Sequence, residues 1–196
     1  MAITKRQAAD LARQAFDYAP APEAIDHVRI QPRYGLFIGG KMVEPHSKKR
    51  FPTINPATEL KLAEVAEADE VDVGKAVSAA GTAFTSWSRM APSRRARYLF
   101  RISRLIQERA RELAVVETMD GGKPIKESRA VDVPLSAAHF FYYAGWADKL
   151  EWAFRNRRPR PLGVAGQVIP WHFPLLMLAW KLAPSMADGI TVLLTP

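Results

Sequence analysis

The C-terminal part of the sequence constrains the fold more than any other part. Residues 164–169 and 191–194 are two short strand-like runs, and between them lie a proline-bounded turn and an apolar helical stretch at 175–187. Two buried strands joined by a helix pair in parallel, because the helical crossover returns the chain to the same end of the sheet. The order strand, turn, helix, strand therefore predicts the opening βαβ unit of a nucleotide-binding α/β domain.

Apolar residues cover two faces of the predicted helix. One face carries Phe173, Leu176, Met177 and Trp180, and another carries Leu175, Leu178 and Leu182. A helix that is apolar on two faces is buried on two sides. We therefore expect this helix to be covered on both.

The preceding sequence predicts short strands followed by packed helices. Gly39-Gly40 between two short apolar runs is typical of a β-hairpin at 35–43. Strands are expected at 50–54 and 60–66, and helices at 5–18, from Asp69 to Trp87, from 91–93 onward, at 109–119 and at 131–150. In the helix that starts at 91–93, the residues expected to face inward are Leu99, Ile102, Leu105 and Ile106.

The chain is basic, with a net charge of +8, so a polyanionic partner has to be considered. The basic residues of the central helices are interleaved with Glu108, Glu112 and Glu117, which favours a solvated helix face over a nucleic-acid patch. The arginines in question are Arg94, Arg95, Arg97, Arg101, Arg104, Arg109 and Arg111. The denser cluster at 155–160 is interpreted as a charged, proline-blunted edge strand.

The sequence contains no cysteine, which excludes disulfides, thiolate metal sites and a cysteine nucleophile within these 196 residues. The four histidines are scattered, so no metal site is predicted. No apolar run reaches the roughly 18 residues of a membrane span, and no secretory signal is recognised. We therefore expect no membrane partner and a cytoplasmic location.

The run 161–196, PLGVAGQVIPWHFPLLMLAWKLAPSMADGITVLLTP, resembles the aldehyde dehydrogenase superfamily. The turns Ile54-Asn55-Pro56-Ala57-Thr58 and Tyr143-Ala144-Gly145-Trp146-Ala147 extend the resemblance over about residues 34–196. It implies an α/β fold in which a β-hairpin and helical region (35–160) follows an N-terminal helix and linker (1–34). Residues 161–196 would then start an incomplete, Rossmann-like NAD(P)-binding domain. The family oxidises aldehydes to acids: a cysteine thiolate attacks, NAD or NADP takes the hydride, and water releases the thioester.

The resemblance also implies roles for residues of the Pro170–Pro174 turn and its flanks. His172 occupies the position where the family usually has an oxyanion-binding Asn. The residues implied in cofactor binding are Val168, Ile169, Pro170, Trp171 and Thr195, the last of which replaces a usual Lys. The residues implied in the aldehyde channel are Phe173, Leu176, Met177 and Trp180.

Three functions remain open at this point. The first is the N-terminal part of an NAD(P)+-dependent aldehyde dehydrogenase, inactive alone because the cysteine and the glutamate base of the family would lie beyond it. The second is a non-catalytic relative that associates with a full-length subunit. A homo-oligomer is a further possible partner state of the chain. The third and less favoured is a basic nucleic-acid-binding module.

Overall fold

The computed structural model describes residues 24–154 and 159–195. The expected helix at 5–18 and most of the arginine cluster at 155–160 lie outside these residues. Pro159 and Arg160 are described and form no strand. The first part contains a 3₁₀ helix, η1 (Ile25–His27), and the strands β1 (Arg33–Tyr34), β2 (Leu36–Ile38), β3 (Lys41–Val43), β4 (Arg50–Ile54) and β5 (Lys61–Ala66).

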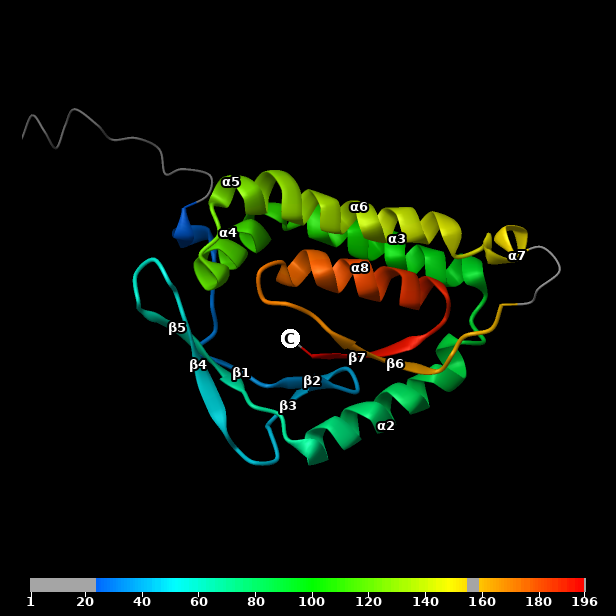
Figure 1. Cartoon of the computed structure of the whole chain (residues 1–196), viewed down its shortest axis with the longest axis horizontal. Helices are drawn as coiled ribbons and strands as arrows, with labels where there is room; N and C mark the ends of the chain where they lie inside the picture. Colours follow the sequence, from blue (N-terminus) through cyan, green and yellow to red (C-terminus); the bar gives the residue numbers. More distant parts are fainter. Residues whose placement is uncertain (1–23, 155–158, 196) are drawn as a thin grey trace, which may run out of the picture.

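Helices dominate the remainder of the described chain (Figure 1). They are α2 (Glu70–Trp87), α3 (Pro92–Glu108), α4 (Ala110–Gly121), α5 (Ile125–Glu127), the π-helical segment η2 (Ser128–Asp132), α6 (Val133–Trp146), α7 (Leu150–Ala153) and α8 (Pro174–Ala187). The strands β6 (Val164–Val168) and β7 (Thr191–Thr195) flank α8 in the chain.

The predicted hairpin is confirmed. Strands β2 and β3 pair antiparallel, with Leu36 opposite Val43. Gly39 and Gly40, with φ of 60° and 80°, adopt the left-handed conformation that a tight hairpin turn requires. In the second small sheet, β5 lies between β1, to which it is parallel, and β4, to which it is antiparallel.

The predicted start of α2 is confirmed as well. Asp69 accepts a hydrogen bond from the backbone N–H of Asp72, and the Asp72 side chain returns a contact to the backbone of Asp69, which forms a capping box. A glycine ends α4: its C-cap is Gly122, which has a φ of 70°. A Cβ there would lie 2.6 Å from Pro56 Cγ, so only glycine allows the helix end to pack against the Asn55–Thr58 turn.

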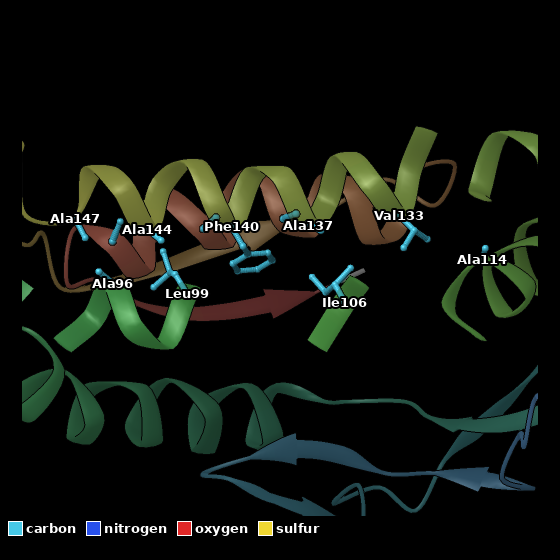
Figure 2. Close-up of a cluster of buried hydrophobic side chains, with 12 residues drawn as sticks. Ala96, Leu99, Ile106, Ala114, Val133, Ala137, Phe140, Ala144 and Ala147 are labelled. Carbon is cyan, nitrogen blue, oxygen red and sulfur yellow. The ribbon is translucent and has the colours of Figure 1, made fainter. Parts of the chain in front are cut away.

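The core lies between α3, α6 and α8 (Figure 2). Leu99 on α3 and Phe140 on α6 are fully buried, and Ala137 and Ala144 of α6 lie beside them. On α8 the core residues are Ala179, Ala183 and Ala187. The small alanine side chains of α8 let its backbone approach that of α6 closely, so the two helices pack directly against each other.

Three expectations about the central helices are wrong in detail. Leu105 does not face inward: its side chain is 45% exposed. Arg95 does not lie on a solvated face: it is 5% exposed, and its guanidinium donates to the carbonyl oxygens of Ala187 and Met90. The long helix starts at Val133 rather than at 131, because a π-helical segment precedes it, and it ends at Trp146.

The predicted βαβ unit is confirmed. Strands β6 and β7 pair in parallel with Val164 opposite Thr191 and Val168 opposite Thr195. Helix α8 covers one face of this ribbon, and α2 packs against the other, so the unit is part of a layered structure (Figure 1). Within residues 24–154 and 159–195, no strand pairs with the other edge of β7. The division of the chain at residues 34 and 160 stays a prediction.

Candidate functional site

The turn that connects β6 to α8 lies at the carboxyl ends of two parallel strands. The backbone N–H of Ile169 donates to the carbonyl oxygen of Thr195 over 3.1 Å, and the Thr195 hydroxyl lies 3.5 Å from the carbonyl oxygen of Gln167. Val168 is in register with Thr195. The fold therefore brings the predicted cofactor residues from the two strands to one edge, where nucleotides bind in doubly wound sheets.

These residues differ in what they can present at that edge. Trp171 is 81% exposed and Val168 is 69% exposed, so both side chains are open to contact from outside. The side chain of Ile169 is buried, and Pro170 is half-buried. Ile169 can therefore contribute backbone groups only. A further side chain, which the sequence did not single out, reaches the edge from α8: the Lys181 ammonium donates to the carbonyl oxygen of Val168.

His172 is exposed, and its ring meets the ring of Phe173 edge-on, with 4.7 Å between centroids. Phe173 is the N-cap of α8, and no side-chain hydrogen bond caps this helix. His172 therefore does not serve as a helix cap. Its ring nitrogens make no hydrogen bond to any residue that the structure describes.

The predicted channel residues line one side of α8 to different depths. Phe173 and Met177 are half-buried, Leu176 is buried, and Trp180 is 46% exposed. The Trp180 ring packs edge-on against His139 of α6, with 5.5 Å between centroids. Burial lowers the pKa of His139, which favours a neutral imidazole beside Trp180.

The other apolar face of α8 turns toward the core. Leu175, Leu178 and Leu182 pack against the buried cluster of α3 and α6. The expectation that α8 is covered on both apolar faces is therefore met only in part. One face packs on the core, whereas on the other Leu176 is buried and Trp180 is 46% exposed.

A buried ion cluster, which the sequence did not reveal, lies directly beside the turn. The Lys123 ammonium is 3.3 Å from Glu117 Oε1 and also contacts Asp132 Oδ2. Glu117 and Asp132 are almost fully buried, and the Lys123 side chain is 12% exposed. The same ammonium lies 3.8 Å from the centroid of the Phe173 ring. The cluster thereby connects α4 and η2 to the residue that starts α8.

Comparison with known sequences identifies the family. A sequence profile of the aldehyde dehydrogenase family matches residues 42–196. The chain belongs to the aldehyde dehydrogenase family. It is 45% identical over 169 residues to "Aldehyde dehydrogenase family 2 member B4, mitochondrial" from Arabidopsis thaliana, a match that covers 81% of this chain and 31% of the relative. It is 42% identical over 190 residues to human "Aldehyde dehydrogenase, mitochondrial", which covers 90% of this chain and 37% of the relative.

Solved structures agree with the aldehyde dehydrogenase fold. The NAD+ complex of aldehyde dehydrogenase from Bacillus cereus superposes with a TM-score of 0.78 at 38% identity. The match covers 84% of this chain and 36% of the Bacillus cereus chain. The expected fold class, the N-terminal part of the aldehyde dehydrogenase fold, is therefore confirmed. This chain spans about a third of the length of the curated relatives it matches.

A hollow on α3 is lined by Arg97, Phe100, Arg101, Arg104, Leu105 and Glu108. None of these residues belongs to the turn. Across residues 24–154 and 159–195, no helix is long and apolar enough to cross a membrane, and no cluster of three His, Asp or Glu residues is arranged to hold a metal ion.

We expect the ion cluster to make stability depend on pH. Burial, together with the hydrogen bond to Asp132, raises the pKa of Glu117 from 4.5 to about 7, against the opposing charge of Lys123. Between about pH 4.5 and 7 the folded chain keeps a proton that the unfolded chain releases, so stability falls as pH rises through this window. The size of the shift corresponds to roughly 3 kcal/mol. Glu117→Gln should remove this loss and raise the melting temperature at pH 8 more than at pH 5.

Thermal melts between pH 5 and 8 check this result. Glu127→Gln is the matched control, because Glu127 is exposed on α5. If Glu117→Gln melts with the same pH dependence as the unmodified chain, Glu117 is not the buried acid that takes up the proton.

Proposed function

We propose that this chain forms the N-terminal part of an NAD(P)+-dependent aldehyde dehydrogenase that oxidises an aldehyde to a carboxylic acid. The observation that carries the proposal is the β6–α8–β7 unit with the Pro170–Pro174 turn at its carboxyl edge, in a chain of this family. Val168, Ile169, Pro170, Trp171 and Thr195 would hold NAD or NADP at this edge. The nicotinamide of the cofactor supplies the hydride acceptor. The Bacillus cereus relative was solved as an NAD+ complex, which supports this assignment.

The residues around the turn would orient the aldehyde. Phe173, Met177 and Trp180 would form the apolar wall along which it approaches, and the buried Leu176 would support that wall from behind. His172 would donate a ring N–H to the oxygen of the aldehyde as negative charge develops there. A fixed donor aimed at a developing oxyanion stabilises the transition state more than the bound substrate.

A second candidate function is that of a non-catalytic relative that associates with a full-length subunit. Two departures from the family pattern favour it: His172 stands where the family usually has Asn, and Thr195 where it usually has Lys.

A chimeric enzyme tests the proposal. The N-terminal third of the Bacillus cereus enzyme is replaced by this chain, so that the remainder supplies the nucleophilic cysteine that the resemblance places there. We expect the chimera to form NADH when an aliphatic aldehyde is added, and the remainder expressed alone to form none.

A second chimera, which carries the N-terminal third of the Arabidopsis relative, controls for the junction. If that chimera is active and the first is folded but inactive, the proposed function is wrong and the non-catalytic reading replaces it.

A further inference from the structure

We propose that Lys123 is a positioning residue for the Pro170–Pro174 turn, which it holds by placing its ammonium, clamped between Glu117 and Asp132, over the ring face of Phe173. The placement itself follows from the contacts of the described residues. Only its consequence for catalysis rests on the proposed function.

The backbone around Lys123 fixes where its side chain can go. Lys123 lies between Gly122, the left-handed C-cap of α4, and Pro124, the N-cap of α5, which has a φ of −56°. Both neighbours restrict the local backbone strongly, glycine by occupying a region closed to other residues and proline through its ring. The Lys123 side chain is therefore directed inward rather than free to sample the surface, which agrees with its 12% exposure.

The two carboxylates fix the far end of the side chain. Glu117 comes from α4 and Asp132 from the end of η2, so the ammonium is held from two separate elements. Glu117 Oε2 and Asp132 Oδ1 are buried and have no hydrogen-bond partner among the described residues. Lys123 bonds the other oxygen of each acid, Glu117 Oε1 and Asp132 Oδ2, and is the cation that both acids contact. Losing the ammonium would leave two buried acids facing each other without a cation.

The ammonium that contacts the two acids also lies over the face of the Phe173 ring. A cation within about 6 Å of a ring centroid is attracted by the negative face of the ring, and the attraction grows when water is excluded. Here the separation is 3.8 Å, and the ammonium is largely buried. Phe173 thus has a defined position although no side-chain hydrogen bond caps the helix that it starts.

His172 depends on Phe173 in turn. The edge of one ring meets the face of the other with 4.7 Å between centroids. The His172 ring has no hydrogen bond to another described residue, so this packing is what orients it. The contacts therefore run from the two acids to Lys123, from Lys123 to Phe173, and from Phe173 to His172, the residue to which the oxyanion role is assigned.

The test uses the full 196-residue chain and follows the His172 ring by NMR, with its signal assigned by loss in His172→Gln. The nearby Phe173 ring shifts this signal by its ring current, and Phe173→Leu removes the shift. We expect Lys123→Met to move the signal most of the way to its Phe173→Leu position, and to cause no further change when the two substitutions are combined. Lys123→Arg, which keeps a cation able to stack on the ring, should preserve the original position.

Lys126→Met is the matched control, because Lys126 is exposed three residues further along the chain. A Lys123→Met variant that melts at a lower temperature but keeps the His172 signal in place would show a role in stability alone and overturn the proposal. If Lys123→Met does not fold, the Phe173→Leu variant, which keeps the ion cluster intact, is measured instead. Its Lys123 Hε signals should lose the upfield shift caused by the Phe173 ring current. Unchanged Hε signals would overturn the proposal.

The catalytic consequence has a separate readout in the chimeric enzyme. There Lys123→Met should lower kcat on the order of 10-fold to 10²-fold, with a smaller change in KM, because a misplaced group acts mainly in the transition state. If the chimera has no activity, the proposed function fails while the NMR result still stands. An unchanged kcat in an active chimera would contradict the positioning role in catalysis.

Discussion

The 196-residue chain by itself should form no NADH from an aldehyde. The family reaction, as the resemblance implies it, begins with attack of a cysteine thiolate on the aldehyde carbon, and hydride leaves only from the resulting thiohemiacetal. This sequence contains no cysteine at any position. Without the nucleophile the covalent intermediate cannot form, so the expected loss is complete rather than partial.

The measurement is aldehyde-dependent NADH formation by purified chain, against the same chain after heat denaturation. The chimeric enzyme is the positive control, since it differs by supplying the missing portion from a relative. NADH formation by the cysteine-free chain alone, beyond the denatured control, would require a different nucleophile and would contradict the covalent route.

The elements that the sequence predicted correctly are those that local chemistry determines. The β2–β3 hairpin follows from Gly39-Gly40, which can adopt positive φ, and α2 starts where Asp69 caps it. The parallel pairing of β6 and β7 follows from the two apolar runs with a helix between them. In each case the residues that determine the element lie within it or directly beside it.

The elements that were predicted wrongly depend on contacts across the chain. Arg95 lies among other arginines in sequence, but it is buried because the end of α8 offers it the carbonyl oxygen of Ala187, 92 residues away. Leu105 fits the apolar spacing of α3 and is nevertheless exposed, since spacing cannot show how far the neighbouring α6 extends over the helix. Helical periodicity predicts a face but not the width of the surface that covers it.

In the candidate site too, the sequence indicated the local feature and missed the one built from distant contacts. The Pro170–Pro174 turn could be found from sequence because its residues are contiguous and resemble a family pattern. The ion cluster could not, because Glu117 comes from α4, Lys123 from the link between α4 and α5, and Asp132 from η2. One local signal existed: Glu117 directly follows the apolar pair Val115-Val116, and an acid within an apolar helical stretch needs a buried cation.

His172→Asn in the chimeric enzyme should raise kcat, with an effect of up to about 10². An oxyanion site works best with a hydrogen-bond donor held in fixed geometry, which an Asn amide supplies. The imidazole of His172 is bulkier, donates only from a nitrogen that carries a proton, and is oriented here by ring packing on Phe173 rather than by a hydrogen bond. The gain should appear in kcat more than in KM, because the oxyanion exists only along the reaction path.

The changes in kcat and KM caused by His172→Asn distinguish an oxyanion role of His172 from simple contact with the substrate. His46→Asn serves as the control, because His46 is an exposed histidine whose side chain contacts Asp69 at the start of α2, away from the turn. A fall in kcat with His172→Asn, or no change, would show that the imidazole is already an effective donor in this chain. That result would make the positioning role of Lys123 more important. A histidine that works as well as the family's Asn must be held in place by Phe173 and by the Lys123 ammonium that lies over the Phe173 ring.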